Sequence, residues 1–371
     1  MFRGIEGLRA WLAWIVVFSH ILLFSDATTL YPQMKVLSKF GGYSVEVFII
    51  ISGFVITNLI LAKKEPYKIY IARRFLRIYP VYLICLLLAI LSFELAFEAV
   101  SALPYADLNN LKHFSDQARE LAEGRGLWHI LAHLSLFHGA IPNNILMESQ
   151  YMFNAPAWSL SLEWQFYLLA PFIISGLMNE KFRLYVVLAA VALFLCYQRG
   201  YFGEFYLPSI IFGSGPLFLV GIASRLVIEK IKPLDAYPIA IVVGCLVFCY
   251  WSKSMIPIVA WVWMMGYLLL SEEAIKKPDF YTKVLNFMLD SKLAKAAGDR
   301  SYSVYILHCV VIVFILYHAQ FTFHQREFSG IFTFTALGTI IFTLLGSEIF
   351  YRYVEKPSIA LGKRLPSGKN N

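Results

Sequence analysis

The sequence predicts an all-α polytopic membrane protein with about ten transmembrane helices and both termini in the cytoplasm. Hydrophobic residues make up 59% of the 371 residues and charged residues only 15%, whereas a soluble domain carries roughly 25% charged residues. Ten apolar runs approach the ~20 residues that cross a hydrocarbon core of about 30 Å. We find no repeat and no separate soluble domain, so we expect a single membrane domain over residues 1–371.

The ten apolar runs define the predicted elements in chain order. We place the spans at 8–26, 45–62, 78–99, 159–178, 183–198, 208–228, 236–251, 255–271, 301–320 and 329–351. With the N-terminus inside, 24 of the 32 Lys and Arg residues fall in inside segments and 8 in outside segments. The positive-inside rule predicts this bias, and the even number of spans places both termini inside. The net charge of +8 is therefore a topology signal that needs no nucleic acid as partner.

Two long segments lie between the spans. Residues 100–158 are expected outside, with a polar helix over 107–123 and a short apolar piece over 127–138. Residues 272–300 are expected inside, as a basic surface helix beside the lipid headgroups. His129 and His133 are spaced like metal ligands, but no acid and no further ligand accompany them. We therefore favour interfacial packing for these histidines and expect no metal.

Arg9 and His20 lie in the first span, eleven residues apart. At 100° per residue, eleven steps return to within about 20° of the same helix face, ~16 Å further along the axis. Ionisable groups at that depth are costly and usually line functional cavities. An imidazole is the side chain best suited to accept a proton from a hydroxyl near neutral pH. We therefore predict His20 as a catalytic base and Arg9 as a site residue.

A second polar stretch opens the fourth span. Trp158 is expected at the outer interface, which places Glu163 about 7.5 Å deeper. Ser159 shares the helix face of Glu163 through their i, i+4 spacing. At that depth Glu163 could meet His20 across helices, fix its tautomer and stabilise its imidazolium form. A structural contact with a serine or an arginine is the alternative.

An arginine cluster precedes the third span. Arg74 and Arg77 are neighbours at i, i+3, and we expect them to open a helix whose N-terminal amides also attract anions. Paired hydrogen bonds from two guanidinium groups can hold phosphates. With His20 half a membrane away, a reagent with an anionic head and a long arm, such as a coenzyme A thioester, would fit. Positive-inside anchoring explains the same residues without a ligand.

Two further polar faces are candidates. Glu46 lies seven residues before Gly53, so it shares a stripe with a glycine that allows close helix packing. It is either a site residue or a structural contact. Ser301, Tyr305 and His308 form one face of the ninth span. Core packing and contacts to an acceptor or cofactor are equally credible for that face.

These segments resemble the integral-membrane acyltransferases of the acyltransferase-3 family, nearly from end to end. Arg9 with His20 looks like the Arg-x10-His motif of the family, and Arg74 with Arg77 looks like its Arg-x-x-Arg motif. The other matching stretches are 44–54 in the second span, 158–163, 301–308 and 355–357. They add Ser52, Trp158 and Ser161 as candidate site residues. Trp164 stands where the family usually has a second acid, and Ser44 where it usually has glycine.

The resemblance implies O-acylation of cell-envelope carbohydrate from acyl-CoA, most often acetyl-CoA and sometimes a succinyl donor. It implies His20 as the essential catalytic residue, Arg9, Arg74 and Arg77 near the coenzyme, and Glu163 as a site acid. It also implies a multi-pass protein of the inner cell membrane, here in a standalone form without the C-terminal esterase-like domain of some relatives.

Three functions follow from these patterns. We favour an acyltransferase whose acceptor is a carbohydrate or glycolipid, with lipopolysaccharide, capsule, exopolysaccharide and a secondary metabolite all open. A transporter or flippase for an acyl donor or lipid-linked sugar is the alternative, although no inverted repeat is visible. An inactive scaffold fits poorly with so many polar groups at depth. Acyl length and oligomeric state are not predicted.

Overall fold

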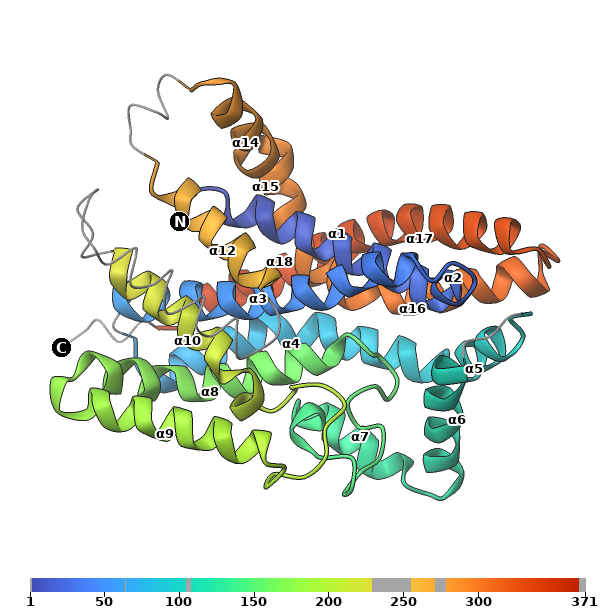
Figure 1. Cartoon of the computed structure of the whole chain (residues 1–371), viewed down its shortest axis with the longest axis horizontal. Helices are drawn as coiled ribbons and strands as arrows, with labels where there is room; N and C mark the ends of the chain where they lie inside the picture. Colours follow the sequence, from blue (N-terminus) through green and yellow to red (C-terminus); the bar gives the residue numbers. More distant parts are fainter. Residues whose placement is uncertain (1, 64, 105–107, 229–254, 271–277, 367–371) are drawn as a thin grey trace.

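The computed structural model describes residues 2–63, 65–104, 108–228, 255–270 and 278–366, and all regular structure within these ranges is helical (Figure 1). Seven helical runs in this part of the chain are long and apolar enough to cross a membrane. They are α1 (Ile5–Phe24), α3 (Met34–Ala62), α4 (Tyr67–Leu91), α8 (Ala157–Met178), α10 (Ile211–Ile228), α16 (Ser301–Phe321) and the run Phe328–Arg364, which begins with α17 (Phe328–Phe350). The chain is therefore an all-α, multi-pass membrane protein.

Two shorter or less apolar helices correspond to further predicted spans. These are α9 (Glu180–Gln198) and α12 (Ile256–Leu268). The predicted span 236–251 lies outside the described residues. The other nine predicted spans each fall on a helix of the described chain.

The second and third spans begin earlier than predicted. The helix α3 starts at Met34 rather than at residue 45, and α4 starts at Tyr67 rather than at residue 78. The helix α4 also ends at Leu91, where the short helix α5 (Phe93–Ser101) takes over. A search for apolar runs misses these helical extensions because the added turns carry polar, basic and glycine residues, which lower the mean hydropathy of the segment.

The centre of the bundle is α3, which packs against α1 and α10, while α16 packs against α1 and α17. The contact between α3 and α10 is a close backbone approach. A Cβ atom at Gly221 would clash with the carbonyl oxygen of Ile50, and one at Gly53 would clash with that of Phe218. Small residues let membrane helices approach in this way, which confirms the packing role predicted for Gly53.

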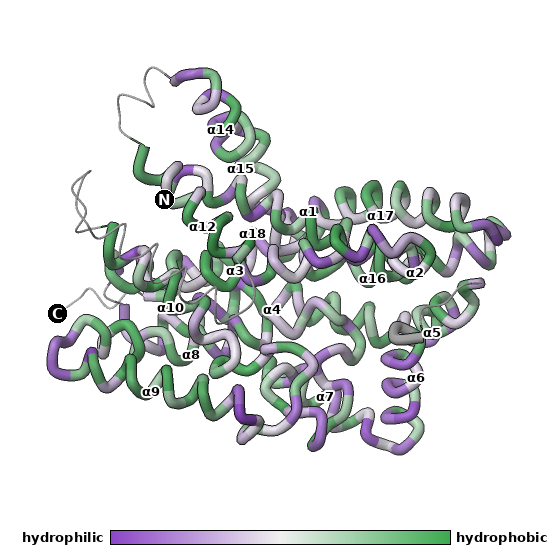
Figure 2. Tube along the Cα trace, viewed as in Figure 1, coloured by the Kyte–Doolittle hydropathy of each residue, from purple (hydrophilic) through white to green (hydrophobic). Residues whose placement is uncertain are grey.

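The outer helices present apolar side chains to their surroundings. None of the residues of α9 is buried, and α17 exposes several large side chains, among them Leu337 and Leu345. Figure 2 shows the hydrophobic colouring along α9 and α17, and the hydrophilic colouring concentrated in α6 and in connecting segments. This distribution fits helices whose outer faces meet lipid.

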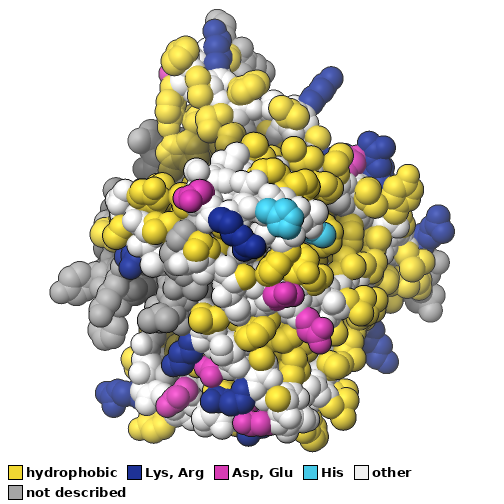
Figure 3. All heavy atoms as spheres, turned by 90° about the vertical axis from the view of Figure 1, so that its right-hand side faces the viewer, with side chains coloured by type: hydrophobic (Ala, Val, Ile, Leu, Met, Phe, Trp, Pro, Cys, Tyr) yellow, Lys and Arg dark blue, Asp and Glu magenta, His cyan; other side chains and the backbone are white. Residues whose placement is uncertain are grey.

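One end of the bundle gathers the segments that were predicted to lie outside, together with α5, most of which was predicted to belong to the third span. They comprise α2 (Ala27–Leu30), α5, α6 (Leu108–Ala122), α7 (Gly126–Leu134) and η1 (His138–Ala140). Phe24 at the end of α1 packs in a cluster with Leu316 of α16, Ile331 of α17 and Phe114 of α6. Figure 3, which looks at this end, shows basic, acidic and histidine side chains among the hydrophobic ones.

The segments predicted to lie inside gather around the starts of α1 and α4. They comprise α14 (Phe280–Asp290), α15 (Lys292–Asp299), the π-helical turn η2 (Tyr351–Glu355) and α18 (Lys356–Arg364). Arg3 binds Asp290 at 3.1 Å. Arg73 on α4 donates to the carbonyl oxygens of Gly362, at 3.1 Å, and Leu365, at 2.9 Å.

The segment that leads into α8 enters the bundle, which corrects the predicted position of Trp158. The side-chain amide of Asn154, which is 1% exposed, donates to the carbonyl oxygen of Ile306 at 3.1 Å. The α8 helix therefore starts beside the second turn of α16 and not at the outer end of the bundle. Trp158 is half-buried against the main core cluster, so it does not mark the outer interface.

Candidate active site

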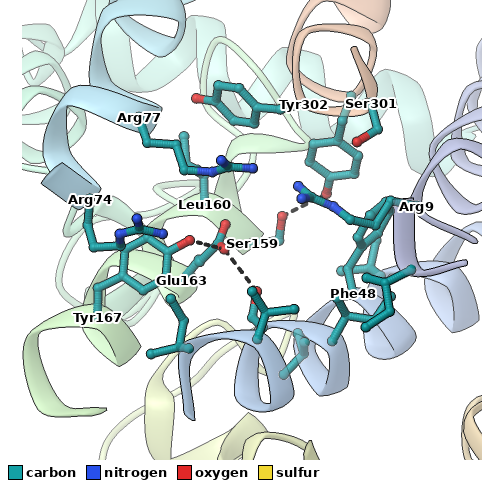
Figure 4. Close-up of a pocket in the computed structure, with 18 of the residues that line it drawn as sticks. Arg9, Phe48, Arg74, Arg77, Ser159, Leu160, Glu163, Tyr167, Ser301 and Tyr302 are labelled. Atoms are coloured by element: carbon teal, nitrogen blue, oxygen red, sulfur yellow. Dashed lines mark hydrogen bonds between the residues drawn. The ribbon is translucent and has the colours of Figure 1, made fainter. Parts of the chain in front are cut away.

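A cavity of about 260 Å³ lies between α1, α3, α4, α8 and α16 (Figure 4). Seven of its polar lining residues were predicted as site residues: Arg9, Ser52, Arg74, Arg77, Ser159, Glu163 and Tyr305. Ser301 of α16 also lines it. The five helices thus bring together residues that are up to 296 positions apart in the sequence, from Arg9 to Tyr305.

The arginines approach the cavity from two sides. In Figure 4, Arg74 and Arg77 extend from α4 and Arg9 extends from α1 toward the space between them. The buried Nε atom of Arg74 has no hydrogen-bond partner, and the Arg74 guanidinium lies 5.9 Å from the ring centre of Tyr167. An arginine cluster with an unpaired buried donor suits an anionic ligand.

One part of the expected arginine site is wrong. Because α4 begins at Tyr67, Arg74 and Arg77 lie two and three turns into the helix. The N-terminal amides of α4 are therefore not beside these side chains, and only the guanidinium groups face the cavity.

Glu163 has different partners from those expected. Its carboxylate accepts a hydrogen bond from Ser52 at 2.8 Å and another from Tyr167, one turn further along α8. Within the described chain, no hydrogen bond or ion pair joins Glu163 to His20. The prediction placed both at one height because it set Trp158 at the outer interface. Since α8 starts deeper in the bundle, Glu163 lines the same cavity as Arg9 instead.

Hydroxyl groups connect α8 and α16 at the cavity. Ser159 and Tyr305 share a hydrogen bond of 2.7 Å, and the Tyr305 hydroxyl also donates to the carbonyl oxygen of Pro156 at 3.2 Å. Tyr302 donates to the carbonyl oxygen of Ile78 at 2.5 Å and so fixes α16 against α4. Ser159 and Glu163 face the same cavity, as their i, i+4 spacing predicted.

His20 pairs with His308. The Nδ1 atom of His20 lies 3.1 Å from the carbonyl oxygen of Val16 and 3.1 Å from Nε2 of His308. Neither histidine lines the cavity. Tyr305 connects the two regions, because its side chain lines the cavity and its ring centre lies 6.0 Å from that of His308.

His20 and two neighbouring side chains are arranged as possible metal ligands, although the sequence predicted no metal site. The donor atoms of His20, His308 and Cys309 lie within 4.8 Å of one another. Sequence spacing could not reveal this group, because helix packing alone brings His20 to the other two. It is the only such group found among the described residues.

The outer histidines form a separate buried cluster. His129 contacts Glu120 at 3.4 Å, and His133 contacts the hydroxyl of Tyr82 at 3.0 Å. The rings of His133 and His138 stack with centres 3.9 Å apart. All three histidines are 0% exposed, and burial lowers the pKa of His138 to about 3. These three histidines therefore pack against Glu120, Tyr82 and one another within the segment that precedes α8.

Three other predicted residues lie away from the cavity. Ser161 is buried and accepts a hydrogen bond from the backbone N–H of Gly139 at 3.1 Å, so its hydroxyl fixes η1 against α8. Trp158 packs against the core. Glu46 lies on α3 beside the cavity residue Val45 but does not line the cavity.

Sequence reasoning missed Tyr167 and Phe48. Tyr167 follows Glu163 by four residues, so the same i, i+4 rule that selected Ser159 could have found it. Phe48 lines the cavity and packs against Tyr305 with ring centres 5.8 Å apart. An apolar residue within an apolar span gives no such signal.

Comparison with known proteins finds a family model and several relatives. A family model described as an acyltransferase domain matches residues 2–352. The chain is 24% identical over 392 residues to the O-acetyltransferase OatA of Staphylococcus aureus, covering 95% of this chain and 56% of the relative. It is 26% identical over 388 residues to the peptidoglycan O-acetyltransferase OatA of Listeria monocytogenes, covering 95% and 55%.

A third relative is the acyltransferase MdmB of Streptomyces mycarofaciens, which is 30% identical over 174 residues, covering 45% of this chain and 38% of the relative. The chain spans a little over half the length of the OatA proteins. No solved structure matches it significantly. Because the family model covers nearly the whole chain, including every residue of the cavity and the histidine pair, the chain belongs to the acyltransferase-3 family.

Proposed function

We propose that the protein is a membrane O-acyltransferase that moves an acyl group, acetyl by default, from acyl-CoA to a hydroxyl of a cell-envelope carbohydrate. The observation that carries this proposal is the meeting of Arg9, Arg74 and Arg77 in one cavity, with the His20–His308 pair beyond Tyr305. The names of the OatA relatives, one of which is a peptidoglycan O-acetyltransferase, support the carbohydrate acceptor.

The cavity would hold the anionic head of the donor. Three guanidinium groups face it, against the carboxylates of Glu6 and Glu163. Two of these guanidinium groups can bind one phosphate with paired hydrogen bonds. The rise from Arg9 to His20 along α1 is ~16 Å, so the donor must carry its reactive group on a long arm. A coenzyme A thioester has this shape.

The acyl transfer would take place at His20. Its imidazole takes the proton of the acceptor hydroxyl as the oxygen attacks the thioester carbonyl. The C–O ester bond forms, the C–S bond breaks, and the proton passes from His20 to the leaving thiolate. For the thioester to reach His20, the donor arm must pass Tyr305 and Phe48, whose rings pack together at the edge of the cavity.

The acceptor would approach from the opposite end of the bundle. That end carries the helices α2, α5 and α6 and presents basic, acidic and histidine side chains among hydrophobic ones (Figure 3). A donor from the cytoplasm and an acceptor from the cell envelope would then meet at His20, with the protein in the inner cell membrane.

Purified protein in vesicles tests the proposal. With acyl-labelled acyl-CoA and a cell-envelope glycan fraction, we expect label in ester linkage to carbohydrate, detected by mass spectrometry. His20→Ala should abolish this product while yield and melting temperature hold, because a positioned base accounts for roughly 10²–10⁴ in rate. Transport of intact donor without any ester, or full activity of His20→Ala, would contradict the proposal.

A further inference from the structure

His308 contacts the proposed base from a neighbouring helix. It lies on α16 and is 0% exposed, and its Nε2 atom is 3.1 Å from Nδ1 of His20. The Sγ atom of Cys309 lies 3.4 Å from the same Nε2. A second imidazole thus contacts Nδ1 of His20, whereas the sequence predicted that the carboxylate of Glu163 could fix the tautomer of His20.

The carbonyl oxygen of Val16 indicates which ring nitrogen of His20 carries the proton. It lies 3.1 Å from Nδ1 of His20 and can only accept a hydrogen bond. The proton must therefore be on Nδ1, which leaves a lone pair on Nε2 of His20. Nε2 of His308 lies at the same distance, 3.1 Å, from Nδ1 of His20, so with the proton on Nδ1 it faces that N–H group with its lone pair.

We propose that His308 is a positioning residue that holds His20 in the Nδ1–H tautomer, with Nε2 free as the base. This inference rests on the proposed function. When Nε2 of His20 takes the hydroxyl proton, the positive charge of the imidazolium is shared with the Nδ1–H group. This group faces two hydrogen-bond acceptors, Nε2 of His308 and the carbonyl oxygen of Val16. An acceptor at this position plays the part that a carboxylate plays in a catalytic triad.

The same geometry argues against a metal ion between His20, His308 and Cys309. A metal ion held by Nδ1 of His20 would need the lone pair of that atom, and in the proposed tautomer Nδ1 carries the proton that faces Val16. Purified protein should therefore contain no stoichiometric transition metal. A bound metal that is lost in both His20→Gln and His308→Gln would overturn the proposed tautomer.

Nitrogen NMR of the resting protein tests the tautomer without any need for activity. In protein labelled with ¹⁵N-histidine, the signals of His20 and His308 can be assigned by their loss in His20→Gln and His308→Gln. We expect His20 to be protonated at Nδ1 and unprotonated at Nε2, and His308 to be unprotonated at Nε2. A protonated Nε2 on His308 would overturn the proposal, even if acyl transfer is confirmed.

Kinetics then test the positioning role. His308→Leu keeps the side-chain volume but removes the acceptor, so kcat should fall about 10–100-fold while KM for acyl-CoA stays near the wild-type value. His308→Gln restores an acceptor and should recover most of kcat. His318→Gln, at the far end of the same helix, should behave as wild type.

Two results separate the two proposals. Equal kcat for wild type and a folded His308→Leu, or equal losses in the Leu and Gln variants, would overturn the role of His308. A wild-type protein that transfers no acyl group would instead overturn the proposed function, and the NMR result would still decide the tautomer. Melting temperatures of all variants verify that they fold.

Discussion

Arg73 and Arg74 are neighbours in the sequence, but their side chains have different partners. Arg73 binds the carboxylate of Glu65 and the backbone around Gly362, which ties α18 to α4. Arg74 points into the cavity, where its Nε atom has no partner. Composition alone cannot separate the two roles, because both residues satisfy the positive-inside rule.

Because Arg73 and Arg74 have different surroundings, the same substitution should have different effects at the two positions. Arg74→Gln should raise KM for acyl-CoA about tenfold or more, since a charge-assisted hydrogen bond contributes roughly 1.5–3 kcal/mol, and should leave the melting temperature near the wild-type value. Arg73→Gln should lower the melting temperature and leave KM unchanged. Steady-state kinetics and thermal denaturation in detergent measure both. A reversal of this pattern would show that the cavity is not the donor site.

Relations between residues of one helix of the site could be predicted from the sequence, but contacts between helices could not. Ser159 and Glu163 were correctly placed on one face because both belong to α8. The contact between Glu163 and His20 was wrong because it depended on the relative height of two helices. That height is set by Asn154 and its neighbours, which enter the bundle before α8 begins.

Among the helices, the contact between α3 and α10 depends on two glycines, because a side chain at either position would clash with the backbone of the other helix. Gly221 and Gly53 each face a carbonyl oxygen of the opposite helix. Gly215, on the same helix α10, has no neighbour within 4 Å of the position of a Cβ atom. Substitutions at Gly221 and Gly215, which both lie on α10, can therefore be compared as a matched pair.

Gly221→Leu should destabilise the protein, because overpacking typically costs about 1–3 kcal/mol and here the helices must also separate. We expect a melting temperature several degrees lower and a lower yield of folded protein. Gly215→Leu should retain the wild-type melting temperature. Equal stability of the two variants would contradict the close crossing of α3 and α10.

The buried histidines of α7 and η1 predict a response to acid. The unfolded chain binds a proton on His138 below a pH of about 6.5, but burial lowers the pKa of the folded side chain to about 3. The unfolded state therefore binds more protons than the folded state between these values. The contribution to stability is complete above pH 6.5 and is lost as the pH falls toward 3.

His138→Phe tests this response, because a phenyl ring can keep the stack with His133 and cannot take up a proton. The difference in melting temperature between pH 7 and pH 5 should be smaller for this variant than for the wild type. His318→Phe, at the outer end of α16, should keep the wild-type difference. An unchanged acid response in His138→Phe would contradict the proposed cause.

At the scale of the whole molecule, segments assigned to one side of the membrane by charge also lie together in space. Among those assigned outside, the backbone N–H of Asn143 donates to the carbonyl oxygen of Glu204 at 2.8 Å. Among those assigned inside, Arg3 binds Asp290. The charge bias and the packing thus support one orientation of the bundle.

Single cysteines test this orientation in a variant without the five native cysteines. Tyr201, which is 75% exposed, and Leu293, which is 74% exposed, form a matched pair on opposite sides. A membrane-impermeant maleimide should label Tyr201→Cys in intact cells and Leu293→Cys only after permeabilisation. Labelling of Leu293→Cys in intact cells would refute the topology.

Hydropathy, charge bias and helical periodicity are local properties of the chain, so the all-helical membrane fold, nine of the described helices and the residue types of the site could be predicted from the sequence. Where α4 begins, how deep α8 lies and which side chain faces His20 could not. These features depend on packing between residues hundreds of positions apart, as in the pairing of His20 with His308.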